Sequence, residues 1–253
     1  MRGMDGGERS GWCPILMYHR VTLQEPDLDP HHLCVSVDRL AGQLDRLENA
    51  GFSAVPLELA ARPAGRGEGS RYAITFDDGY IDNLELALPI LMSRSLPAIL
   101  FVPTRRLGRT SAWDADALQL LTPAQLREWH AAGMLVGSHS RTHLRLTQLS
   151  GTDLRDEVRG SKADLEDLLG DEVRFFAYPY HDLDARVAAE VAEAGYAGAV
   201  GGRAGAHTRF NLHRVDAGRL EGWRFTAATG DLLHNVRRLP LPGPARRLAA
   251  RFM

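Results

Sequence analysis

Strand-like and helix-like segments alternate along most of the sequence. The apolar runs PAILFVP (97–103), MLVGSH (134–139) and VRFFAYPY (173–180) are separated by helical patterns, the longest from about 152 to 169. Repeated strand–helix units predict a parallel sheet joined by right-handed crossovers, either doubly wound or closed into a barrel. The 253 residues contain no visible repeat or low-complexity linker, so we expect a single α/β domain.

Local signals predict where several helices begin and end. Ser36 precedes an amphipathic run that stops at Gly51, and Thr122 stands before Pro123, the residue type favoured at the first helical position. Gly170 closes the longest helical pattern. These residues divide the chain into short units of the size that a barrel or doubly wound sheet requires.

Two adjacent acids, Asp77 and Asp78, end the strand-like run RYAITF and are followed by Gly79. Neighbouring carboxylates repel one another, and burial increases the cost. Successive strand residues point to opposite faces, so both acids can serve one site only if the backbone turns, which Gly79 permits. An Asp-Gly pair is also a common turn, so this stretch alone indicates no function.

The segment GSHSRTH places His139 and His143 four residues apart where another strand ends. Alone, they could be two unrelated surface or capping histidines. The carboxyl ends of parallel strands share one edge, so these histidines and the two acids are expected to meet. A divalent metal held by Asp78, His139 and His143 would neutralise one carboxylate and activate a water molecule, leaving Asp77 as a base.

TFDDGY together with SHSRTH resembles the first two motifs of the polysaccharide deacetylase family, also called carbohydrate esterase family 4 or the NodB-homology family. The likeness continues through ILMYHRV, FAYPY and EAGYAGAV, roughly residues 14–216. It implies a distorted (β/α) barrel with about seven parallel strands. It also implies metal-dependent removal of N-acetyl groups from N-acetylglucosamine-type sugars. Asp77 would be the general base and the other three residues the metal ligands, with zinc expected and cobalt or nickel as alternatives.

The resemblance offers two histidines, His19 and His213, for the role of general acid. Family members usually supply it from a late LxH strand, for which NLHRV, with His213, is not a close match. ILMYHRV resembles instead the circularly permuted biofilm-polysaccharide deacetylase branch, in which an N-terminal strand carries the acid. We therefore expect His19 to be the general acid, with His213 as the fallback. The alternative is that His19 is a capped or buried histidine at a strand end.

The third motif, FAYPY, departs from the family at two positions. Ala177 stands where an arginine is typical, and His181 stands where a glycine is typical. The arginine normally contacts the base aspartate, so Arg174 or Arg214 would have to replace it. His181 could narrow the groove, contact the substrate or be an ordinary polar loop residue.

The resemblance also suggests residues on the substrate side of the site. The backbone N–H of Tyr180 could help to bind the oxyanion, and Trp223 could wall the acetyl pocket or simply pack in the core. Asp82 and Asn83 are expected to cap the helix that follows the paired acids.

Charge and terminal segments limit the partners. The formal net charge of −2 gives no general attraction to nucleic acid. Residues 1–12 are expected to be flexible, 13–222 to form the barrel and 223–253 a helical, basic tail. The N-terminus lacks the apolar run of a secretory signal and no segment is long enough to span a bilayer, so we expect a cytoplasmic protein. The tail could contact a membrane surface or a partner, or remain solvated.

Three alternatives to an N-deacetylase of sugars remain open. The barrel could bind carbohydrate without turning it over, remove O-acetyl esters or open a cyclic amide. Without an export signal, an intracellular glycan precursor is a candidate substrate alongside oligosaccharides.

Overall fold

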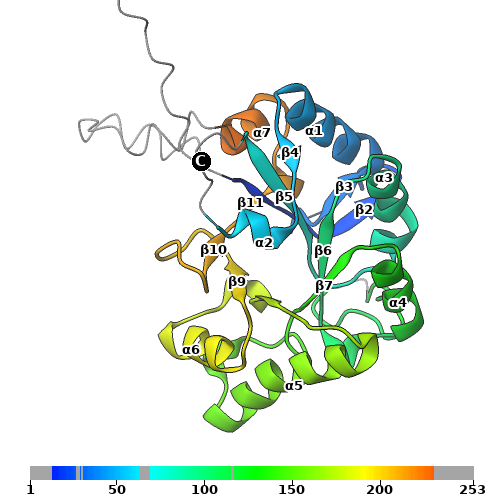
Figure 1. The fold of residues 1–253 in the computed structure, drawn as a ribbon. Helices are drawn as coiled ribbons and strands as arrows, with labels where there is room; N and C mark the ends of the chain where they lie inside the picture. Colours follow the sequence, from blue (N-terminus) through cyan, green and yellow to red (C-terminus); the bar gives the residue numbers. More distant parts are fainter. Residues whose placement is uncertain (1–12, 27–28, 30, 63–68, 115–116, 231–253) are drawn as a thin grey trace, which may run out of the picture.

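The computed structural model describes residues 13–26, 29, 31–62, 69–114 and 117–230 (Figure 1). Within them, parallel strands follow one another in the spatial order β10-β9-β8-β7-β6-β5-β1-β11, with β4 pairing β5. Their bounds are β1 Ile15–Tyr18, β4 Ser53–Ala54, β5 Arg71–Phe76, β6 Ala98–Val102, β7 Leu135–Ser138, β8 Phe175–Ala177, β9 Gly198–Gly201, β10 Leu212–His213 and β11 Val215–Asp216. A separate pair joins β2 (Arg20–Thr22) to β3 (Cys34–Ser36).

The sheet is nearly closed into a barrel, which confirms the predicted (β/α) fold. Its two outermost strands, β10 and β11, are separated in sequence by Arg214 alone. The two edges of the sheet therefore approach each other at this residue. β1 lies between β5 and β11, so the N-terminal strand takes part in the closure, as a permuted barrel allows.

Helices surround the barrel (Figure 1). They are α1 Val37–Asn49, α2 Leu57–Ala60, α3 Leu88–Ser93, α4 Pro123–Ala131, α5 Gly151–Leu169, α6 Ala185–Glu193 and α7 Gly222–Thr229. A large apolar cluster lies between strands and helices, and a smaller one fills the barrel interior with side chains such as Ala73, Phe101 and Phe175. Because strand residues alternate, Thr75 and Asp77 follow Ala73 on the inward face of β5.

The predicted helix ends are largely confirmed. Ser36 accepts a hydrogen bond from the Arg39 N–H, Thr122 forms a capping box with Gln125, and Gly170 ends α5 in the left-handed conformation. The helix after the paired acids differs from expectation, because it opens with a π-helical stretch, Asn83–Ala87, that no side chain caps.

Most of the two predicted terminal segments, 1–12 and 231–253, lies outside the described residues. Of the predicted tail, the structure describes α7, which packs against α1. Within the described ranges, no helix combines the length and apolarity needed to cross a membrane.

Candidate active site

Both paired acids reach one site because the chain turns sharply as it leaves β5. Asp78 has φ 72° and Gly79 has φ 73°, so two successive residues are left-handed. A Cβ on Gly79 would lie 2.8 Å from Cγ1 of Val102, so the glycine is required for close packing as well as for the turn. The sequence correctly predicted a turn here but assigned it to Gly79 alone, whereas Asp78 itself adopts the unusual conformation.

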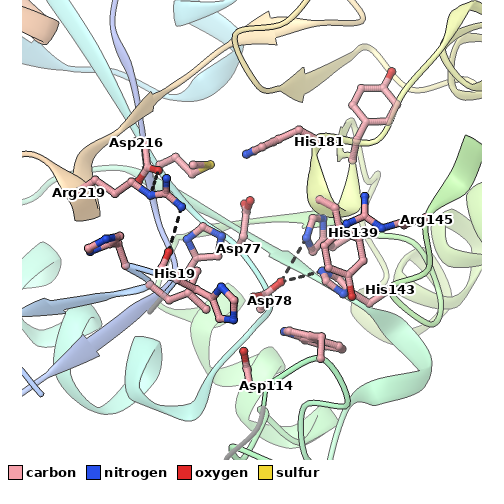
Figure 2. A pocket seen from close by; sticks show the side chains of 17 residues that line it. His19, Asp77, Asp78, Asp114, His139, His143, Arg145, His181, Asp216 and Arg219 are labelled. Atoms are coloured by element: carbon pink, nitrogen blue, oxygen red, sulfur yellow. Dashed lines mark hydrogen bonds and ion pairs between the residues drawn. The ribbon is translucent and has the colours of Figure 1, made fainter. Parts of the chain in front are cut away.

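Asp78, His139 and His143 form a buried triad whose potential ligand atoms all lie within 4.8 Å of one another. Oδ1 of Asp78 is 3.3 Å from Nε2 of His139 and 3.2 Å from Nε2 of His143 (Figure 2). Nδ1 of His139 donates to the carbonyl oxygen of Ala177 at 2.8 Å, so its Nε2 is free to act as a ligand. Two imidazoles and one carboxylate, converging in a buried site, suit a divalent transition metal.

The environment of the triad favours a charged aspartate. Burial opposes ionisation of Asp78, but the charge of His143 and hydrogen bonds with both imidazoles hold its pKa well below the ordinary value. Burial disfavours the charged form of both histidines. At His139 the hydrogen bond with Asp78 and the nearby acids prevail and raise the pKa. At His143 burial prevails and lowers the pKa.

A buried glutamate on α5 shapes the turn between the two histidines, although no sequence motif points to it. Oε2 of Glu157 accepts from the backbone N–H groups of Arg141 and Thr142 at 2.8 and 2.9 Å, and Oε1 accepts from the Thr142 hydroxyl at 2.5 Å. His143 follows with φ 64°. Glu157 therefore fixes the backbone that presents His143.

Arg214 neutralises the second acid. Its guanidinium donates two hydrogen bonds to the carboxylate of Asp77, both 2.7 Å long, and a further one to Oγ1 of Thr75 at 3.2 Å. Burial would raise the pKa of Asp77, but the charge and hydrogen bonds of Arg214, together with the charges of His139 and His19, outweigh burial and bring the pKa to about 2. Of the two arginines that could have filled the position left by Ala177, Arg214 is the one at the site; Arg174 pairs with Glu58 on the surface.

His19 lies on the opposite side of the paired acids from the two triad histidines and lines the same pocket, whose volume is about 350 Å³. Asn83 Nδ2 donates to the carbonyl oxygen of His19 at 2.7 Å, and Asp82 accepts from the Val21 N–H at 3.1 Å. Asp82 and Asn83 were expected to cap a helix; instead they hold the segment that carries His19. The fallback histidine, His213, packs against His207 and is not part of the pocket lining.

The assignment of Trp223 to the pocket wall does not match the structure. Its side chain lies on α7, 63% exposed, away from the residues that line the pocket. Trp113 is the tryptophan at the site, with its ring centroid 3.9 Å from that of His143. Its indole N–H donates to the Tyr80 hydroxyl at 3.1 Å, and that hydroxyl donates to Asp114. Trp113 lies in a loop without a motif, so sequence reasoning missed it.

Tyr180 and Arg145 form the side of the pocket next to the triad. The Tyr180 ring lies 4.7 Å from the His143 ring, and the Arg145 guanidinium lies 4.5 Å from the centre of the Tyr180 ring. The backbone of Tyr180 is left-handed, with φ 56°, which is unusual for a residue other than glycine. An aromatic face beside a polar site is a suitable surface for a sugar ring.

Fold and site together define a hydrolase-type barrel with a candidate metal site, the Asp78, His139 and His143 triad, at the carboxyl ends of its strands. The model of the polysaccharide deacetylase family matches residues 64–199, more than half of the chain. The protein therefore belongs to the polysaccharide deacetylase family.

Individual relatives agree with this assignment. The Bacillus subtilis protein YxkH, provisionally named a polysaccharide deacetylase, is 26% identical over 215 residues, covering 82% of this chain and 72% of its own. The Streptococcus pyogenes deacetylase PplD, solved with acetate, is 26% identical with a TM-score of 0.69, covering 81% of this chain and 91% of its own. IcaB from Ammonifex degensii shares the fold at 24% identity with a TM-score of 0.72, and the match covers 87% of this chain and 96% of IcaB.

Membership makes deacetylation of a polysaccharide the established class of activity and a carbohydrate the class of substrate. The family uses a divalent metal, and the Asp78, His139 and His143 triad offers a site for it.

Proposed function

We propose that this protein is a metal-dependent hydrolase that removes N-acetyl groups from an N-acetylglucosamine-type sugar, oligosaccharide or glycan precursor. The observation that carries the proposal is the buried triad of Asp78, His139 and His143 with the ionised Asp77 beside it at the same strand end. PplD, whose structure contains acetate, adds support, since acetate is the product that such a reaction releases.

Asp78, His139 and His143 would hold the metal, for which we propose zinc. Their chemistry fits: one carboxylate and two imidazole nitrogens leave further coordination positions open, as catalytic sites require. When bound, the metal lowers the pKa of a water molecule and polarises the acetyl carbonyl. The proposal does not depend on zinc, because the same ligands accept cobalt or nickel.

The remaining steps belong to residues of this chain. Asp77 accepts the proton of the attacking water at its carboxylate, which Arg214 keeps ionised and oriented. The backbone N–H of Tyr180 donates to the acetyl oxygen as negative charge develops there. His19 gives a proton to the amide nitrogen, so that the C–N bond breaks and acetate and a free amine leave.

The biological substrate and location are also proposals. A pocket volume of about 350 Å³ is enough for one or two sugar units at the site itself. A cytoplasmic protein acting on a glycan precursor is consistent with this size. Peripheral membrane contact through the basic tail remains a prediction, because residues 231–253 lie outside the described ranges.

The decisive test is acetate release from a panel of N-acetylated oligosaccharides and glycan precursors, with O-acetylated sugars included. We expect turnover of an N-acetylated sugar by the wild type and a loss of at least about a hundredfold in kcat for Asp77→Asn and His19→Ala. His213→Ala is the matched control for His19→Ala, since its side chain does not line the pocket. Full activity of Asp77→Asn would refute the assignment of the base.

Metal analysis distinguishes the enzyme from a carbohydrate-binding barrel. The wild type should carry one divalent ion per chain that disappears in Asp78→Ala and His139→Ala. A protein that binds chitooligosaccharide without metal and releases no acetate would favour the binding module. Preferential release from O-acetylated sugars would favour an esterase.

A further inference from the structure

His181, which the proposed reaction does not use, lies on the short turn that follows β8 and lines the pocket. It has φ 55° and the preceding Tyr180 has φ 56°, so two consecutive residues other than glycine are left-handed. Such backbone strain persists only where the surroundings enforce it, and it is concentrated at functional sites.

Contacts on both sides hold the turn in place. Asp182 accepts hydrogen bonds from the backbone N–H and the hydroxyl of Thr147 at 2.9 and 2.8 Å. The backbone N–H of His181 donates to the backbone carbonyl oxygen of Tyr178 at 3.0 Å. The imidazole packs on Gly202, where an added Cβ would come within 3.0 Å of the ring. The His181 ring is therefore held in one orientation.

The two ring nitrogens of His181 differ in their environments. Nδ1 is fully buried and has no hydrogen-bond partner among the described residues. An orphaned N–H is costly, so the proton belongs on Nε2 of this pocket-lining side chain. Burial, followed by the charge of Arg214, lowers the pKa of His181 to about 4, so the ring is neutral at neutral pH and offers one donor.

Figure 2 shows the imidazole of His181 reaching over Asp77, apart from His143 and the other triad residues. The charges that act most strongly on it are those of Arg214 and Asp77. An acetamide that reacts between Asp77 and the triad would leave its sugar ring within the same pocket, on the side where His181 lies.

We propose that His181 is a substrate-binding residue whose Nε2–H donates a hydrogen bond to a ring hydroxyl of the acetamido sugar. This inference rests on the proposed function for the identity of the sugar. It makes the rigid turn after β8 a determinant of sugar specificity, and it explains why the chain retains a strained histidine there.

The test measures binding of di-N-acetylchitobiose by isothermal titration calorimetry in an Asp77→Asn background, which prevents turnover. His181→Gly suits the left-handed backbone and should leave folding intact or improved. We expect it to weaken binding roughly three- to tenfold, as loss of one neutral hydrogen bond does, while His181→Gln, which keeps an N–H near the same place, restores part of the affinity.

Ser95→Gly is the matched control. Ser95 has φ 53° in an exposed turn remote from the pocket, so the substitution relieves similar strain without touching the site. It should leave the dissociation constant unchanged. Equal affinities of His181→Gly and Ser95→Gly for the disaccharide would overturn the inference.

Acetate release by the wild type, measured in parallel, separates this inference from the proposed function. Release without any effect of His181→Gly on binding refutes only the role of His181. Binding that depends on His181 without acetate release supports the contact and refutes deacetylation of this disaccharide. Failure of the disaccharide to bind refutes the contact, and failure of the whole panel to release acetate refutes the proposed function.

Discussion

Replacing Arg214 by methionine should destabilise the protein strongly, because it leaves the carboxylate of Asp77 buried without a counter-charge. The two side chains are only 1% and 2% exposed and share two hydrogen bonds of 2.7 Å. Removing one partner of such a buried pair costs about 3–5 kcal/mol. We therefore expect the free energy of unfolding of Arg214→Met at pH 7 to fall by that amount.

The lowered pKa of Asp77 is the net result of burial, which raises it, and of Arg214, His139 and His19, which lower it. Its value of about 2, against an ordinary 3.8, corresponds to roughly 2.4 kcal/mol of stabilisation of the charged form. Because the folded-state pKa lies below the unfolded one, this stability is present above about pH 4 and is lost as the pH falls toward 2. Without Arg214, the largest of the causes that lower this pKa is lost, so the pKa of Asp77 should rise and the stability lost between about pH 4 and pH 2 should shrink.

The assay is urea denaturation with a chelator present, so that metal binding does not contribute. Arg174→Met is the matched control, since Arg174 forms an exposed ion pair and should contribute at most about 1 kcal/mol. The double variant Asp77→Asn with Arg214→Met should recover much of the lost stability. The reasoning is refuted when Arg214→Met costs no more than Arg174→Met.

Three further effects are expected. Glu157→Gln should weaken zinc binding about tenfold in a competitive chelator titration. One of the two side-chain oxygens that hold the turn before His143 becomes an amide nitrogen, which cannot accept a hydrogen bond. An unchanged zinc affinity would exclude this positioning role. Burial raises the pKa of Asp82 to about 6, so the wild type should lose up to about 3 kcal/mol of stability as the pH rises from 4 to 6. Urea curves of Asp82→Asn should lack this slope, and a slope equal to that of the wild type would contradict the assignment. Zinc at a hundred times its dissociation constant should stabilise the wild type by about 2.7 kcal/mol and leave Asp78→Ala unaffected in thermal scans.

The fold and the clustering of Asp78, His139 and His143 could be predicted from the sequence because their signals are local. Strand and helix periodicities identify the barrel, and parallel strands bring their carboxyl ends to one edge. The paired acids and the His139–His143 spacing therefore predict a common site without knowledge of any long-range contact. The family assignment and the fold class are confirmed, whereas the roles of Asp77, His19 and Tyr180 remain predictions.

The supporting contacts were at best narrowed to alternatives, such as Arg174 or Arg214 for Asp77, because they join residues that are distant in sequence. Arg214 and Asp77 are 137 positions apart, and their pairing depends on how the barrel closes. Trp223 was selected because a tryptophan is typical of the family, but α7 leaves it on the surface, and Trp113 reaches the site from a loop. Nothing in the local sequence of α5 distinguishes Glu157. Its role follows from the neighbouring turn, whose backbone N–H groups at Arg141 and Thr142 require a hydrogen-bond acceptor.

The two adjacent acids avoid mutual repulsion through different partners, and this difference determines how each responds to perturbation. Asp77 is compensated by Arg214, a permanent cation within the fold, so removing metal should leave its charge unchanged. Among the described residues, Asp78 forms its ion pairs with His139 and His143, whose charges depend on protonation, so its charge should be compensated by either metal or protons. A chelator should therefore make the stability of the wild type depend on pH in the range where histidine titrates, and Asp78→Asn should abolish that dependence while leaving the Arg214 interaction intact. A chelated wild type with the same pH profile as the metal-loaded protein would show that the triad does not exchange metal for protons.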